Sequence, residues 1–229
     1  MKILIASDKF KGSLTALEAC RAIQEGLKNG NHETRCVPVA DGGDGMAGTL
    51  TDALGGEWRK VQVSGPLGAP VQAGYGLIEN GKTAVIEMAE ASGLALLGES
   101  VKDPWSASTY GTGQLISDAI ARGAQKVILG IGGSATNDGG TGMALALGYR
   151  FLDVEGNEVS SLPADLESVV RIEHPLSTEF PEVTVACDVV NPLLGPNGCT
   201  RIYGPQKGIL PSDSEKHEAR LEHLCSLFG

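Results

Sequence analysis

The chain has 229 residues, of which 41% are hydrophobic and 32 are glycine, and its formal net charge is −10. This composition excludes a disordered chain, because it supplies enough apolar surface to form a core. The negative charge argues against nucleic acid or an anionic membrane as a partner, because no basic patch offsets it.

The cysteines and the apolar runs bear on the cellular compartment. None of the five cysteines forms a C-x-x-C pair, which is typical of a protein in a reducing cytosol. The N-terminal apolar run covers only residues 3–6, too short for a signal peptide. No apolar run approaches the roughly 18 residues of a membrane span. We therefore expect a cytoplasmic protein without a membrane partner.

The N-terminal part alternates between strand and helix patterns. Short apolar runs predict strands at residues 3–6 and 35–39. Apolar residues at helical spacing predict helices over 15–27 and 45–54. This order is typical of a parallel α/β sheet.

The parallel order changes after about sixty residues. Strand patterns then follow one another, and residues 74–88 alternate around Asn80-Gly81, which predicts a β-hairpin. We therefore expect two domains, residues 1–62 and residues 63–229.

The later elements are of both kinds. Predicted helices cover 112–121, 140–147 and 212–228, predicted buried strands cover 126–131 and 183–187, and a predicted hairpin joins 150–154 to 158–159. The fold class expected is α/β, with a parallel α/β lobe and a second α/β lobe that has a mixed sheet and hairpins.

One nucleotide-binding motif occurs in the sequence without the structural context that it requires. Residues 76–83 satisfy the Walker A pattern, whose mechanism requires a strand, a phosphate-binding loop and then a helix. The residues that follow Lys82 instead predict the return strand of a hairpin. We therefore interpret Lys82 as a solvated turn residue.

A second motif supports an alternative function. Residues 130–135 fit the dinucleotide pattern after a predicted strand, and Asp153 is a candidate ribose-binding acid. The polar residues 137–140 interrupt the helix that the motif requires. A dinucleotide-dependent oxidoreductase that uses residues 130–153 is nevertheless kept as the alternative. The four histidines have no metal-ligand spacing, so we expect them at the surface.

The chain repeats one short segment. Residues 41–47 and 138–144 agree at six of seven positions, and each follows a predicted strand and begins a predicted helix. Either two tight turns need the same glycines, or the two helix starts bind anions through their free amides.

Charged residues cluster where the first two predicted strands end. Ser7, Asp8, Lys9 and Lys11 follow the first strand, at the edge where ligands bind in open α/β sheets. Either this is a solvated loop that caps the next helix, or Lys9 or Lys11 neutralises a phosphate.

The second strand is followed by Asp41, Gly42, Gly43 and Asp44, and the two glycines are, like Ser7 and Asp8, candidates to bind substrate or nucleotide. Either aspartate is a candidate for a base or a magnesium ligand, or one of them only caps the next helix.

Further candidates lie in the glycine-rich segment 130–142. Asp138 is a candidate base or second magnesium ligand, and Ser134 and Asn137 are candidates to bind a polar substrate. The other candidate binding residues are glycines or open a predicted helix: Gly132, Gly133, Thr112 and Gly113. Glu87 and Glu90 end a predicted strand and face either the same cleft or solvent.

These residues favour phosphoryl transfer. A helix N-terminus stabilises an anion by about 0.3–1 kcal/mol, so helix ends alone do not hold a triphosphate. Lysines and Mg²⁺ must share that charge. The residues therefore predict a kinase that acts on a small hydroxyl compound, with ATP and Mg²⁺.

The sequence also resembles the class I glycerate kinases, in blocks at residues 7–15, 40–45, 130–140 and 204–208. This resemblance implies ATP-dependent phosphorylation of D-glycerate, usually to 2-phosphoglycerate, with Mg²⁺. It also implies a Rossmann-like lobe, a second α/β lobe, an active site in the cleft between them, and a monomer or homodimer.

Members of that family are longer than this chain, and their C-terminal part completes the first lobe. The resemblance therefore implies an incomplete first lobe here. A non-catalytic ligand-binding fragment is a further alternative for this chain.

Overall fold

A computed structural model describes residues 1–10, 13–40, 43, 45–98, 102–175 and 180–228 of the chain. The candidate residues Lys11, Asp41, Gly42 and Asp44 lie outside the described residues. The strands are β1 (Lys2–Ile5), β2 (Glu33–Cys36), β3 (Glu57–Ser64), β4 (Pro70–Ile78), β5 (Thr83–Glu87), β6 (Lys126–Gly130), β7 (Arg150–Leu152), β8 (Arg171–Glu173) and β9 (Glu182–Ala186). The α-helices are α1 (Ala16–Gly26), α2 (Met46–Ala53), α3 (Ala89–Ser92), α4 (Tyr110–Ala121), α5 (Thr141–Ala146), α6 (Cys199–Lys207) and α7 (Ser214–Ser226), and 3₁₀ turns lie at Leu94–Leu97 and Leu166–Ser168.

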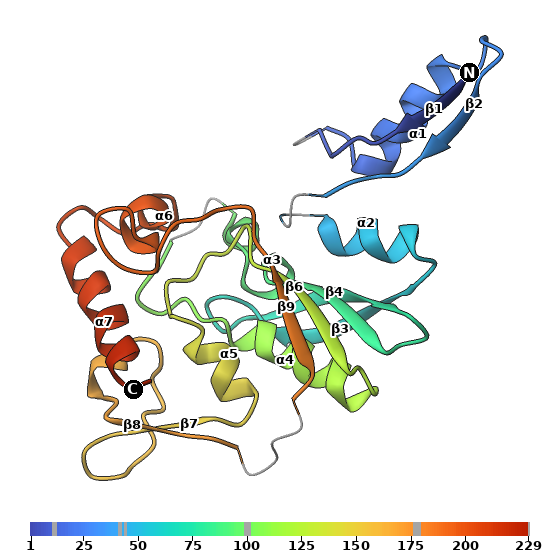
Figure 1. Cartoon of the computed structure of the whole chain (residues 1–229). Helices are drawn as coiled ribbons and strands as arrows, with labels where there is room; N and C mark the ends of the chain where they lie inside the picture. Colours follow the sequence, from blue (N-terminus) through green and yellow to red (C-terminus); the bar gives the residue numbers. More distant parts are fainter. Residues whose placement is uncertain (11–12, 41–42, 44, 99–101, 176–179, 229) are drawn as a thin grey trace.

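The N-terminal unit contains β1, α1 and β2. The two strands pair in parallel, with Lys2 opposite Glu33. Helix α1 begins with a capping box, in which the Thr15 amide donates to the Glu18 carboxylate at 2.8 Å and the Glu18 amide donates to the Thr15 hydroxyl at 3.2 Å. This unit lies to one side of the larger sheet (Figure 1). Its first strand and its helix form within one residue of the predicted bounds, whereas the strand predicted over 35–39 forms at Glu33–Cys36.

The larger sheet has the order β3-β4-β5-β6-β9. Strand β4 is antiparallel to both β3 and β5. Strands β5, β6 and β9 run parallel to one another. The hairpin between β4 and β5 is confirmed, and Glu79, Asn80 and Gly81 all have positive φ in its turn. Because the residues after Lys82 form strand β5, the Walker A interpretation is excluded as expected.

The expected domain boundary at residues 62 and 63 falls inside β3. This strand pairs with β4 from Glu57 to Ser64, so it belongs to the larger sheet. Helix α2 belongs there too, since Met46 and Ala47 pack in one apolar cluster with Val85. We propose that the N-terminal unit ends between β2 and α2.

Helices α4 and α5 pack closely together next to the larger sheet. The main core includes Tyr75 and Ile86 from the sheet and Leu115 from α4. A Cβ atom on Gly113 of α4 would lie 2.5 Å from the Met143 backbone oxygen of α5. Glycine is therefore required at this crossing because the two backbones approach so closely.

The C-terminal part departs most from the sequence expectations. Strand β7 pairs with β8, while the expected hairpin is reduced to a single bridge between Leu152 and Glu158. Strand β9 was expected to be buried, but among the described strands it lies at one edge of the sheet, and Val183 is 49% exposed. Helix α6 was not predicted, because Gly204 and Pro205 lie within it. No helix within the described ranges is long and apolar enough to cross a membrane.

The expectation that all histidines lie at the surface is wrong for His217 of α7. Its ring is 1% exposed, and its centroid lies 3.9 Å from that of Trp105. Arg220, which is also buried, lies over the same tryptophan at 4.8 Å. These contacts join α7 to the segment before α4. Burial, helped by the nearby Arg220 charge, lowers the pKa of His217 to about 4.

We expect His217 to make the folding free energy depend on pH between about 6.5 and 4. In this window the unfolded chain protonates His217 and the folded chain does not, so acidification favours unfolding. The stability advantage of the parent over His217→Gln should shrink by about 2 kcal/mol from pH 7 to pH 5, measured by urea unfolding. His32→Gln, at an exposed histidine, is the control and should not show this pH dependence. If the stability advantage of the parent over His217→Gln is the same at pH 7 and pH 5, the buried neutral ring is contradicted.

We expect Gly113→Ala to destabilise the protein by about 1–3 kcal/mol, because the added methyl group overpacks the crossing of α4 and α5. Gly48→Ala is the matched control, since Gly48 lies within helix α2 and its added Cβ would meet nothing within 4 Å. That control should stabilise the protein by about 0.4–1 kcal/mol. Equal melting temperatures for the two variants would refute the close approach.

Candidate active site

The candidate site lies at the edge of the sheet where the parallel strands end. Glu87 of β5 is opposite Gly130 of β6, and Gly130 is opposite Ala186 of β9. The glycine-rich segment 131–140 follows β6 at this edge. Ligands bind at such carboxyl edges in open α/β sheets, so the predicted residues of this segment lie where chemistry is expected.

Two neighbouring cavities occupy this edge. The first, called here the two-lysine cavity, has a volume of about 520 Å³ and is lined in part by Lys9 and Lys102. The second, called here the Lys207 cavity, has a volume of about 310 Å³ and is lined in part by Lys207 and Asp188. Both are lined by Gly133, Ser134 and Gln206. The shared wall makes them parts of one cleft.

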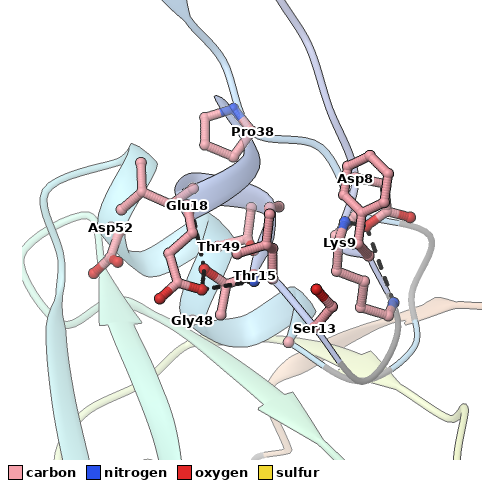
Figure 2. Close-up of a pocket in the computed structure, with 15 residues that line it drawn as sticks. Asp8, Lys9, Ser13, Thr15, Glu18, Pro38, Gly48, Thr49 and Asp52 are labelled. Atoms are coloured by element: carbon pink, nitrogen blue, oxygen red, sulfur yellow. Dashed lines mark hydrogen bonds and ion pairs between the residues drawn. The ribbon is translucent and has the colours of Figure 1, made fainter. Parts of the chain in front are cut away.

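A third cavity, of about 510 Å³, lies between the loop after β1 and helix α2. Figure 2 shows Lys9 and Ser13 from that loop and Thr49 and Asp52 from α2 around it. Lys9 lines this cavity as well as the two-lysine cavity. The N-terminal unit therefore contributes a cation to the cleft of the larger sheet.

The Asp8 carboxylate orients the start of this loop. It accepts a hydrogen bond from the Lys9 amide at 2.6 Å and lies 4.0 Å from the Lys9 ammonium. The Ser7 hydroxyl donates to the Asp8 carbonyl oxygen at 3.0 Å. Ser7 and Asp8 thus shape the loop, and their roles in ligand binding stay predictions.

Lys207 at the end of α6 was missed as a candidate residue. Its ammonium donates to the Ser134 hydroxyl at 2.9 Å and to the Thr136 carbonyl oxygen at 2.6 Å. Burial lowers the pKa of Lys207 below its ordinary value. Only its position in the 204–208 block could have marked it, because a lone lysine in a glycine-rich segment carries no spacing signal.

The carboxylate of Asp138 is committed to the protein's own backbone. One of its oxygens accepts from the Thr109 amide at 2.8 Å, the Thr109 hydroxyl at 2.7 Å and the Gly142 amide at 3.2 Å. The other accepts from the Gly140 amide at 3.1 Å. Asp138 is 2% exposed and holds the start of α5 against the start of α4. Its assignment as base or magnesium ligand stays a prediction that this geometry does not support.

Glu87 binds the start of helix α2 in the same way as Asp138 binds the start of α5. Its carboxylate accepts from the Gly45 amide at 2.9 Å and from the Ala47 amide at 2.6 Å. Gly45 and Gly140 have matching left-handed conformations, with φ of 87° and 80°. Each helix start of the repeat thus combines a left-handed glycine with an internal carboxylate that accepts from its amides. Those amides are not available as anion cradles.

The remaining candidates divide between the cleft and the core. Gly43, Gly132, Gly133 and Ser134 line one or both cavities. Asn137 is 8% exposed and donates to the Thr200 hydroxyl at 3.3 Å. The other two, Thr112 and Gly113, are buried within α4. Binding roles for Asn137, Thr112 and Gly113 stay predictions without support from this packing.

Magnesium is only partly addressed by this structure. Of the candidate ligands, Asp41 and Asp44 lie outside the described residues and Asp138 already accepts four hydrogen bonds. Among the residues that the structure describes, no group of three histidine, cysteine or acidic side chains is placed to hold a metal ion. The described residues therefore do not fit a magnesium site on their own.

Comparison with known proteins identifies the family of this chain. The model of the glycerate kinase family matches residues 3–229. This chain belongs to the glycerate kinase family. Its expected α/β fold is confirmed by a crystal structure from Salmonella typhimurium LT2, provisionally described as glycerate kinase 2. The two have a TM-score of 0.90 and 41% identity over 99% of this chain and 62% of that one.

Two curated relatives also match nearly the whole chain. The Halalkalibacterium halodurans protein named glycerate kinase is 46% identical over 99% of this chain. The Escherichia coli protein named glycerate 2-kinase is 46% identical over 100% of it. The chain spans 61% of the length of each.

We expect Asp138→Asn to destabilise the protein by about 2–4 kcal/mol. The amide group of asparagine would turn a donor toward backbone amides that need an acceptor, and the negative charge at the start of α5 would be lost. The exposed Glu57→Gln is the control and should cost less than about 1 kcal/mol. Urea unfolding measures both, and a cost below 1 kcal/mol for Asp138→Asn would contradict the bonding described.

Proposed function

We propose that this protein transfers the γ-phosphoryl group of ATP to a hydroxyl group of D-glycerate, with 2-phosphoglycerate as the product. The observation that carries the proposal is the pair of cavities that share Ser134 at the carboxyl edge of β5, β6 and β9. One cavity is lined by two lysines, as a polyphosphate requires. The name of the Escherichia coli relative supports the 2-position.

In the proposed reaction the glycerate hydroxyl oxygen attacks the γ-phosphorus while the bond to the ADP oxygen breaks. The hydroxyl proton passes to a carboxylate, for which Asp41 and Asp44 are the candidates. Lys9 and Lys102 neutralise charge on the phosphate oxygens, and the backbone at Gly133 allows close approach. Lys11 is a further candidate for the phosphate.

Magnesium in a kinase neutralises phosphate charge. Its use by this protein is proposed from family membership, and no step above depends on the described residues binding it. A cytoplasmic location and a monomeric or homodimeric state are likewise proposed.

The oxidoreductase alternative gains no support. In the dinucleotide motif a helix begins directly after the first glycines, whereas α5 begins at Thr141. Asp153 accepts hydrogen bonds from the Glu155 and Asn157 amides at 2.9 and 2.8 Å, so its carboxylate stabilises its own turn.

The direct test is phosphorus NMR of the protein with Mg-ATP and D-glycerate, which reports both the product and the phosphorylated position. ATP hydrolysis without phosphoglycerate, or glycerate binding without product, would refute kinase activity for this chain. The second of these results would identify a non-catalytic binding fragment.

We expect Lys102→Met to weaken ATP binding about tenfold or more, since a charge-assisted contact contributes about 1.5–3 kcal/mol. Lys82→Met is the matched control. It removes the exposed lysine of the Walker A pattern, which lies in the hairpin turn, and should leave ATP affinity unchanged. Isothermal titration calorimetry distinguishes the two, and a loss of affinity in the control alone would reverse the assignment.

A further inference from the structure

The Lys207 ammonium is a cation held in place without a carboxylate partner. Of its three N–H donors, two are used by Ser134 and Thr136. No ion pair within 4.0 Å joins it to an acidic side chain among the residues that the structure describes. The negative charge of Asp138 acts on Lys207 only from beyond ion-pair distance. A largely buried ammonium with no carboxylate within 4.0 Å is costly, which indicates that an anionic ligand completes this site.

The two cavities differ in charge. Lys9 and Lys102 line the two-lysine cavity, and none of its described lining residues is acidic. The Lys207 cavity combines one lysine with Asp188, which follows the end of β9. The first is suited to a polyanion. The second is suited to a ligand with one negative charge and a hydroxyl group that can donate to the Asp188 carboxylate.

The size and position of the Lys207 cavity agree with a small hydroxy acid in this cavity and a polyanion in the two-lysine cavity. Its volume of about 310 Å³ is at the low end for ligand sites, which span about 300–1,000 Å³. Ser134 forms part of its wall and also part of the wall of the two-lysine cavity. A small hydroxy acid in one cavity would therefore lie directly beside phosphates in the other.

We propose that the Lys207 cavity is the acceptor subsite, in which Lys207 binds the carboxylate of the hydroxy acid and Asp188 accepts a hydrogen bond from a hydroxyl group. The nucleotide phosphates occupy the two-lysine cavity. This assignment rests on the proposed function, and it adds Lys207 and Asp188 as substrate-binding residues that determine specificity. The Ser134 hydroxyl and the Thr136 carbonyl oxygen are positioning groups, since they hold the ammonium in place.

The test compares D-glycerate with its neutral amide, glyceramide, by isothermal titration calorimetry. The parent protein should bind glycerate at least tenfold more tightly than glyceramide. Lys207→Met should lose most of this preference and keep its affinity for ATP. Lys102→Met should lose ATP affinity and keep the preference for glycerate over glyceramide. Lys207→Arg retains the positive charge and should retain part of the preference, which keeps the test decisive if Lys207→Met fails to fold.

The outcomes separate this inference from the proposed function. If the parent forms phosphoglycerate but Lys207→Met and Lys207→Arg both prefer glycerate as strongly as the parent, the subsite is wrong and the kinase proposal stands. If thermal melting shows that Lys207→Met is folded but this variant loses ATP affinity instead, the two cavities have been assigned in reverse. If the parent neither binds nor phosphorylates glycerate, the proposed function fails and this inference fails with it.

Discussion

The candidate site depends on carboxylates that bind backbone amides at helix starts. Asp138 joins Thr109 before α4 to Gly140 and Gly142 at α5, and Glu87 joins the end of β5 to the start of α2. A carboxylate that accepts several amide hydrogen bonds is strongly held, since each bond is charge-assisted. These bonds attach the glycine-rich segments to the sheet. Both cavities are therefore built against a defined backbone.

The described lining of the cleft carries three lysines. Asp138 and Glu87 bind backbone amides, whereas Lys9, Lys102 and Lys207 line the cavities. In a chain with a net charge of −10, three lysines on one cleft form a local exception. Such a local field attracts anionic substrates although the protein as a whole repels them. The proposed kinase reaction requires this separation of charge.

Much of the fold could be predicted because local patterns dominate it. The apolar spacing over residues 15–27 and the turn at Asn80-Gly81 place α1 and the β4-β5 hairpin within a few residues. Where long-range packing decides, prediction fails. Strand β9 has the valine-rich pattern of a buried strand but lies at the sheet edge, and α6 forms despite Gly204 and Pro205.

The sequence by itself determined the chemistry of the site: lysines, aspartates and glycines at the ends of predicted strands, in the blocks of one family. Only the tertiary structure decided which of the described residues are bound internally and which line the cavities. Asp138 and a free catalytic aspartate are alike in sequence, and the difference lies in the four donors that surround Asp138. Lys207 is 73 residues from Ser134 along the chain. No local pattern encodes such a contact, because it forms only when α6 packs against the loop after β6.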